Sequence, residues 1–149
     1  MKLLGIDTSG KIAAVALCDE NTVLAQTTVL TKLTHSQVIL PLCKDMLANA
    51  GVTLDEIDGI AIANGPGSYT GLRIGISAVK AMCFALNKPC IGISTLESLA
   101  YNLMGFKGTI CSVMSARQNL VYTATFMSNG KEIERLTEDE IISTEALFD

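Results

Sequence analysis

The sequence predicts an α/β domain built around a mixed five-stranded sheet. Short apolar runs typical of strands alternate with longer segments in which apolar residues recur at helical spacing. Three strands joined by tight turns come first, and each of the next two helices stands between two strands. Because strand–helix–strand units add parallel strands to a sheet, this order predicts an antiparallel meander extended by parallel strands.

The first three strands are predicted from apolar runs rich in Val, Leu, Ala and Thr. They cover residues 3–8, 13–18 and 22–33. Thr34 and Gln37 then form the pattern of a capping box, and a helix follows until Gly51. Pro41 lies inside this helix, where it removes one backbone hydrogen bond and is expected to bend the first turns.

The middle of the chain predicts two more strands and two more helices. A strand covers 59–63, a helix 71–87 and a further strand 90–94. The last helix is expected to begin at Ser94, with Glu97 three positions on, and to end at Gly105. Its apolar stripe consists of Leu96, Leu99, Ala100, Leu103 and Met104.

The resulting order is that of the ribonuclease H-like fold, with helices on both faces of the sheet. We expect residues 1–105 to form one such lobe and residues 106–149 to begin a second, incomplete one. The second lobe is predicted to contain strands at 109–115 and 121–127, a turn at 128–130 and a third extended run at 131–136. A helix is expected to start at Ser143.

Charge and cysteine usage exclude several classes of protein. The net charge is −4 and basic residues form no cluster, which argues against tight, independent nucleic-acid binding. Five widely spaced cysteines without a C-x-x-C pair favour a reduced, cytoplasmic location. No secretory leader is expected, because Asp7 interrupts the first apolar run. The longest apolar stretch, 74–86, is too short to span a bilayer and contains Lys80.

The run Asn64–Gly75, which reads NGPGSYTGLRIG, is the most informative motif. Its glycines permit a positive φ or a close approach, and it leads directly into a helix whose N-terminal amides favour an anion. The candidate ligands in this run are Gly65, Gly67, Ser68, Thr70, Gly71 and Arg73. A tight turn without a ligand is the alternative. The run lacks the Lys-Ser/Thr pair of a Walker A loop.

Three motifs together resemble the TsaB (YeaZ) family. They are GPGSYTGLRIG at 65–75, LGIDTS at 4–9, and THSQ at 34–37 ahead of the Leu-Pro pair 40–41. The resemblance covers essentially the whole chain. It implies the two-lobed actin-like (ASKHA) fold and a partner subunit of the bacterial machinery that makes threonylcarbamoyladenosine at position 37 of tRNA.

The residues present argue against a catalytic centre. A ribonuclease H-like nuclease needs several carboxylates around two metal ions, whereas strand ends here supply Asp7 and, in place of a second acid, Asn64. The single histidine, His35, excludes paired-histidine metal sites, and we predict no metal site. The catalytic relative TsaD carries an HxxxH motif on the corresponding helix. His35 is followed by Ser-Gln-Val-Ile, so we expect it at a helix start or an interface.

Asp7, Thr8 and Ser9 resemble the first phosphate loop of actin-like proteins, in which the acid positions a metal-bound phosphate. An ordinary strand-end turn with an Asx or Ser cap is an equal alternative. The family often has Asp where this chain has Ser115, which removes one nucleotide anchor from the second lobe. We therefore expect no firmly bound cofactor, and ATP or ADP only weakly.

The helix predicted at 71–87 has more apolar surface than its own sheet requires. Its polar residues Arg73, Ser77 and Lys80 form one narrow stripe. Packing beneath a second lobe is one explanation. The resemblance implies another, in which the first two helices bundle with those of TsaD or of a second copy. The interface residues expected on that basis are His35, Val38, Leu42, Gly75, Ile76 and Val79, with Ala78 allowing close approach.

The resemblance and these observations together favour a non-catalytic adaptor that dimerises with TsaD in the cytoplasm. The resemblance implies a TsaE-like ATPase as a third component and a homodimer in the absence of TsaD. No membrane contact is expected. Two alternatives stay open. One is a small actin-like ATPase that uses Asp7 and the glycine run, and the other is a homodimer with a role outside tRNA modification.

Overall fold

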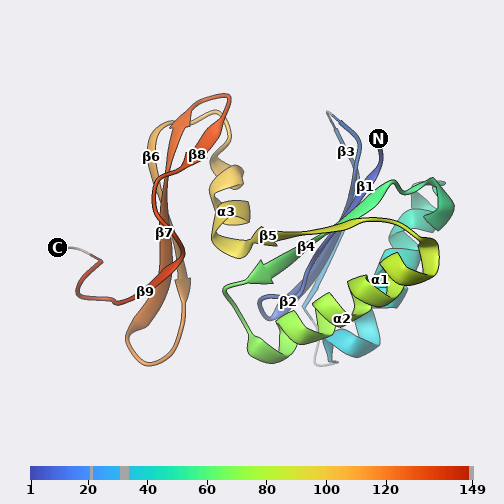
Figure 1. Cartoon of the computed structure of the whole chain (residues 1–149), viewed down its shortest axis with the longest axis horizontal. Coiled ribbons are helices and arrows are strands. Elements are labelled where there is room, and N and C mark those ends of the chain that lie inside the picture. Colours follow the sequence, from blue (N-terminus) through green and yellow to red (C-terminus); the bar gives the residue numbers. More distant parts are fainter. Residues whose placement is uncertain (21, 31–33, 148–149) are drawn as a thin grey trace. The chain divides into compact units, whose positions relative to one another are not determined.

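The computed structural model describes residues 1–20, 22–30 and 34–147 (Figure 1). The chain divides into two compact units. The first unit consists of Met1–Asn64 and Ser68–Ile93, and the second of Gly65–Gly67 and Ser94–Asp149. The third predicted helix therefore groups with the second unit, although we placed the lobe boundary after residue 105.

The first unit contains the mixed five-stranded sheet that the sequence predicts. Its strands are β1 (Leu3–Asp7), β2 (Ile12–Cys18), β3 (Val23–Leu30), β4 (Gly59–Gly65) and β5 (Cys90–Ser94), in the order β3-β2-β1-β4-β5. Strands β1, β2 and β3 pair antiparallel, whereas β4 pairs parallel to β1 with Leu4 opposite Ile60. The strand predicted at 22–33 ends at Leu30, and its last three residues lie outside the described residues.

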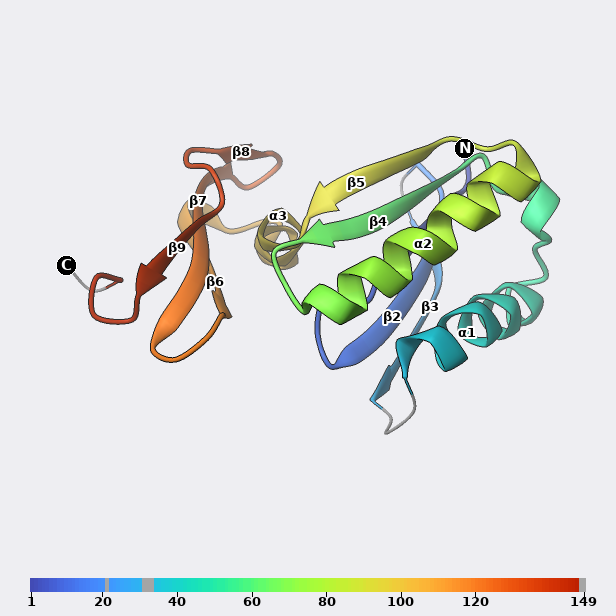
Figure 2. The same cartoon turned by 60° about the horizontal axis from the view of Figure 1, so that its bottom comes forward.

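Two α-helices, α1 (His35–Asn49) and α2 (Tyr69–Leu86), cover the same face of this sheet (Figure 2). A short 3-10 helix, η1 (Leu54–Glu56), follows α1. The predicted capping interaction begins α1, since Gln37 Oε1 accepts a hydrogen bond from Thr34 N at 3.1 Å. The buried residues that join sheet and helices include Leu4, Val15, Leu17, Ile39, Met46, Ile60 and Val79.

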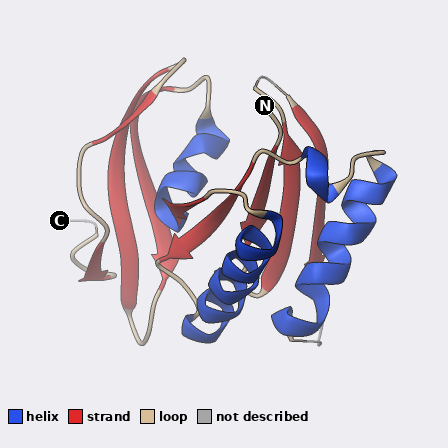
Figure 3. Ribbon diagram, turned by 45° about the vertical axis from the view of Figure 1, so that its right-hand side comes forward, coloured by secondary structure: helices blue, strands red, loops and turns tan. Residues whose placement is uncertain are grey.

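The second unit is an antiparallel sheet with one short helix beside it (Figure 3). Its elements are α3 (Thr95–Ala100), the 3-10 helix η2 (Tyr101–Leu103), β6 (Lys107–Ser115), β7 (Leu120–Asn129), β8 (Ile133–Arg135) and β9 (Glu140–Ser143). Strand β7 pairs with β6, β8 and β9. The core of this unit consists of Leu96, Ala100, Ile110, Ala124 and Phe126.

The helix predicted up to Gly105 is shorter than expected. It keeps its predicted cap, because Ser94 Oγ accepts a hydrogen bond from Glu97 N at 3.3 Å. It ends as an α-helix at Ala100 and continues as the 3-10 helix η2, in which Met104 N donates to Tyr101 O at 3.1 Å. The predicted apolar stripe is therefore only half buried: Leu96 and Ala100 are buried, and Leu99, Leu103 and Met104 are exposed.

The prediction of a helix beginning at Ser143 is wrong for the described residues. Ser143 is the last residue of β9, and a turn covers residues 144–147. Thr144 N donates to Asn119 O at 2.8 Å, which extends the pairing of β9 with β7 beyond the end of the strand. The strand over Glu140–Ser143 had not been predicted.

Candidate functional site

The segment after β1 is tied to the start of α2 by two hydrogen bonds. Thr8 Oγ1 donates to Gly71 O at 2.8 Å, and Ser68 N donates to Ser9 O at 2.7 Å. Thr8 and Ser9 are both buried. The two motifs that the sequence singled out therefore lie against each other, and their polar groups are used to join them.

Asp7 forms the local turn that the sequence left open as an alternative to a phosphate loop. Its Oδ1 accepts a hydrogen bond from Ser9 N at 2.7 Å, which is an Asx turn. One carboxylate oxygen of Asp7 is thereby bonded to the backbone of its own loop. A role for Asp7 in holding a phosphate stays a prediction.

Gly71 and Gly75 are needed because α2 approaches the end of β1 too closely for a side chain. A Cβ atom at Gly71 would lie 2.1 Å from Thr8 O, and one at Gly75 would lie 2.2 Å from Thr8 Oγ1. Real Cβ atoms essentially never make such contacts. These glycines serve the packing of the helix on its own sheet.

The other candidates of the glycine run are dispersed. Ser68 is the N-cap of α2, and its Oγ accepts a hydrogen bond from Gly71 N at 3.2 Å. Arg73 is exposed, donates to Tyr69 Oη at 3.2 Å and lies 5.3 Å from the centroid of that ring. Gly65, at the end of β4 with a φ of 122°, and Gly67 belong to the second unit.

A cavity of about 330 Å³ lies where α1 and α2 begin. It is lined by Lys11, Leu30, Thr34, His35, Ser68, Thr70, Gly71 and Ile74. Helix N-termini and a lysine favour an anion. Three of the predicted phosphate ligands, Ser68, Thr70 and Gly71, line it, whereas Asp7 does not. Lys11 also lines this cavity and was not predicted as a ligand, because it comes from the turn between β1 and β2, far in sequence from the glycine run.

His35 is the first residue of α1, as expected for a helix start. It is half-buried, and its Nε2 lies 2.8 Å from Gly10 O, so it joins the helix to the turn between β1 and β2. Its Nδ1 is buried and makes no hydrogen bond within the described residues. We predicted an interface role for His35, and the structure gives it a partner within its own unit.

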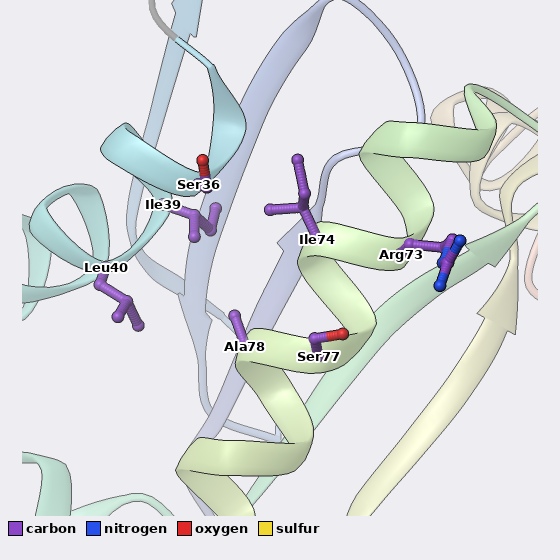
Figure 4. Close-up of a pocket in the computed structure, with 7 residues that line it drawn as sticks. All are labelled: Ser36, Ile39, Leu40, Arg73, Ile74, Ser77 and Ala78. Atoms are coloured by element: carbon purple, nitrogen blue, oxygen red, sulfur yellow. The ribbon is translucent and has the colours of Figure 1, made fainter.

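A second hollow, of about 340 Å³, runs between α1 and α2 (Figure 4). We call it the interhelical groove. It is lined by Ser36, Ile39, Leu40, Arg73, Ile74, Ser77 and Ala78. Ile39 is 1% exposed and belongs to the core, whereas Leu40 beside it is 50% exposed. The groove thus combines aliphatic side chains with two serines and one cation.

The six residues predicted for a partner interface do not line this groove. Val79 is 1% exposed and lies in the core, and Gly75 is buried against Thr8. Both are corrections, because a residue packed on its own sheet has no side chain to offer a partner. Val38, Leu42 and Ile76 are partly buried against the same core. Ala78 does line the groove.

Among the described residues, no group of three or more His, Cys, Asp or Glu side chains is placed to hold a metal ion. None of the described helices has the length and apolarity needed to cross a membrane. Burial raises the pKa of the Cys43 thiol in α1 to about 11.

Comparisons with known proteins relate this chain to TsaD, TsaB and YeaZ. A family model described as "TsaD: tRNA N6-adenosine threonylcarbamoyltransferase" matches residues 22–149. The Bacillus subtilis protein named tRNA threonylcarbamoyladenosine biosynthesis protein TsaB is 34% identical over 140 residues, or 94% of this chain and 61% of that protein. The structure of YeaZ from Pseudomonas aeruginosa matches with a TM-score of 0.83 and 32% identity, covering 95% of this chain and 67% of that one. This chain belongs to the TsaB/YeaZ family.

The TsaB/YeaZ assignment agrees with the actin-like fold predicted from the sequence. An activator of 2-hydroxyisocaproyl-CoA dehydratase from Clostridium difficile matches with a TM-score of 0.59 at 14% identity, a likeness that shows the fold alone. The chain spans less than two thirds of the Bacillus subtilis TsaB protein. In this TsaB/YeaZ chain, the two hollows described above lie at the N-termini of α1 and α2 and between these helices.

Proposed function

We propose that this chain is a non-catalytic adaptor that dimerises with a TsaD-like subunit and supports threonylcarbamoyl transfer to adenosine 37 of tRNA. The name of the Bacillus subtilis relative points to threonylcarbamoyladenosine biosynthesis, and the matching family model carries the TsaD description. The observation that carries the adaptor role is the interhelical groove. A TsaE-like ATPase as third component, and a homodimer without TsaD, are part of the same proposal.

The interhelical groove is suited to receive a helix of another subunit. Two neighbouring helices form a furrow into which the side-chain ridge of a third helix can pack. Ala78 leaves room for a close approach, and the half-exposed Leu40 offers apolar area to bury. Arg73 and Ser77 add polar groups at the same hollow, which resembles the polar rim of protein interfaces.

The chemistry of the chain supports a role without catalysis. Its one histidine is bonded to Gly10 O, and Asp7 caps its own turn. A nucleophile, base and orienting group within hydrogen-bond reach is the usual arrangement for covalent catalysis. Because His35 and Asp7 are both engaged in local hydrogen bonds, we assign the transfer reaction to the TsaD-like subunit.

The test is co-elution of the chain with the TsaD-like subunit of the same organism in size-exclusion chromatography. Ala78→Glu puts a long charged side chain where a partner helix would pack closely, and this should weaken the complex about 100-fold, or about 3 kcal/mol. Ala48→Glu, on an exposed position of α1 outside the groove, is the matched control. Circular dichroism checks that both variants fold. Unchanged co-elution of a folded Ala78→Glu variant would remove the adaptor proposal.

A nucleotide-binding function is the second candidate, and the cavity containing Lys11 favours it. Titration calorimetry with ATP and magnesium distinguishes the two. Micromolar binding that is lost in Lys11→Ala would support the ATPase alternative. Nucleoside analysis of tRNA from cells depleted of this protein addresses the remaining alternative, because normal threonylcarbamoyladenosine would place its role outside tRNA modification.

A further inference from the structure

Two cysteines flank the turn that joins α2 to β5. Cys83 lies in the last turn of α2, and Cys90 is the first residue of β5. Figure 2 shows the turn that connects the end of α2 to the start of β5. Between the two cysteines, Asn87 adopts a left-handed conformation with a φ of 51°, and Lys88 N donates to Cys83 O at 3.0 Å. The chain therefore folds back on itself, and the Cys83 side chain reaches the backbone at Pro89, next to Cys90.

The Cys83 thiol lies against the backbone of Cys90. Cys83 Sγ donates to Pro89 O at 3.6 Å, and this oxygen belongs to the peptide group that joins Pro89 to Cys90. The same oxygen accepts a hydrogen bond from Ile60 N of β4 at 3.0 Å, which fixes its position at the edge of the sheet. Burial raises the pKa of the Cys83 thiol, and the nearby Cys90 side chain raises it further through its charge and a hydrogen bond.

The two thiols differ in their access to solvent. Cys83 is 7% exposed, whereas Cys90 is exposed on β5. A small oxidant can therefore reach Cys90 directly, while Cys83 is shielded and positioned beside it. This is the arrangement of an attacked thiol with a neighbouring resolving thiol.

We propose that Cys83 and Cys90 form a redox-sensitive pair that closes to an intramolecular disulfide on exposure to a hydroperoxide. The Cys90 sulfur attacks the O–O bond, which breaks to give a sulfenic acid and release an alcohol, or water when the oxidant is hydrogen peroxide. The Cys83 sulfur then attacks the sulfenic sulfur, the S–S bond forms, and the hydroxyl leaves as water with the Cys83 proton. Two thiols and one hydroperoxide thus give one disulfide, one alcohol and one water, and a dithiol reverses the reaction.

The disulfide would join the C-terminal turn of α2 to the edge strand of the first unit. Closing this short loop constrains the unfolded chain. It also fixes the end of α2 on β5 by a covalent bond. The proposal does not depend on the adaptor function, since it concerns only the chemistry of the α2–β5 turn.

The experiment treats the reduced full chain with equimolar hydrogen peroxide, blocks the remaining thiols with iodoacetamide and maps the peptides by mass spectrometry. Trypsin leaves both cysteines in the peptide 81–107, because Lys88 precedes a proline. The proposal expects this peptide to lose two hydrogens and to carry no alkyl group on either cysteine. Chymotrypsin, which cleaves after Phe84 and Leu86, should yield two peptides joined by a disulfide.

Single substitutions complete the test. Cys83→Ser should leave Cys90 as a sulfenic acid that dimedone traps, and Cys90→Ser should prevent fast oxidation of Cys83. Cys111 is the matched control, since it is also exposed but its Sγ contacts Thr123 Oγ1 at 3.4 Å. Cys111→Ser should leave closure of the pair unchanged. Oxidation that gives only intermolecular dimers, or equal rates at Cys90 and Cys111 without an 83–90 link, would overturn the proposal.

Discussion

Gly75→Ala tests how tightly α2 packs on the end of β1. In an exposed helix this substitution stabilises by about 1 kcal/mol. Here the new methyl group would lie 2.2 Å from Thr8 Oγ1 and 3.1 Å from Ile62 Cδ1. Overpacking of this kind costs about 1–3 kcal/mol. Displacing the Thr8 hydroxyl also breaks its buried hydrogen bond to Gly71 O, at a further cost of about 1–3 kcal/mol.

The clash and the lost hydrogen bond together outweigh the gain in helix propensity. Gly75→Ala is therefore expected to lower the free energy of unfolding by about 3 kcal/mol. Urea unfolding followed by far-UV circular dichroism is the assay, because the chain has no tryptophan. Gly10→Ala is the control. A Cβ there would meet nothing within 4 Å, so its stability should change by less than about 0.5 kcal/mol.

A double-mutant cycle shows whether the stated contact is the cause. Thr8→Ala removes the hydroxyl, so it should restore part of the stability lost in Gly75→Ala. It should not rescue Gly71→Ala, whose new Cβ meets the backbone oxygen of Thr8 at 2.1 Å. A Gly75→Ala protein that is about 1 kcal/mol more stable than wild type would refute the packing argument, because that is the effect expected in open space.

Two further predictions concern stability. Val79→Glu should unfold the first unit, because it buries a carboxylate at a position that is 1% exposed, whereas Lys80→Glu at the exposed neighbour should change the urea midpoint little. A folded Val79→Glu protein would contradict the placement of Val79 in the core. Hydrogen bonds from Lys2, at 2.8 Å, and from Thr53 lower the pKa of Glu56 from 4.5 to about 2. Ionised Glu56 therefore stabilises the folded state above pH 4.5, and this stabilisation is lost as the pH falls toward 2. The difference in urea midpoint between wild type and Glu56→Gln should narrow over the same pH range. A pH-independent difference would show that the ionised form of Glu56 contributes nothing.

Most of the first unit follows from local patterns in the sequence. The capping residues Thr34 and Ser94 mark helix starts because the hydrogen bonds they make lie within one turn of the chain. The short strands of the second unit depend on partners far away in sequence. Residues Glu140–Ser143 carry no strong alternating pattern, and they become a strand because β7 pairs with them.

The candidate site was predictable only in part. Local spacing placed Ser68 and Thr70 at a helix start, and both line the cavity. Lys11 enters the same cavity through the packing of α2 against the β1–β2 turn, a contact that no local pattern encodes. Conversely, Asp7 matched a phosphate loop in sequence, and the structure shows its carboxylate bonded to its own turn.

Two of the predicted interface residues, Gly75 and Val79, lie on the buried stripe of α2 for a physical reason. This helix has one buried stripe, Gly71, Gly75, Val79 and Cys83, and a neighbouring stripe that contains Ile74 and Ala78. Both are apolar, so periodicity alone does not tell which one meets the sheet. The glycines identify the stripe that meets the sheet, because a residue without a Cβ is required where Thr8, at the end of β1, comes closest to the helix. The stripe with the glycines therefore faces the sheet of its own unit, and the stripe with alanine and isoleucine borders the interhelical groove.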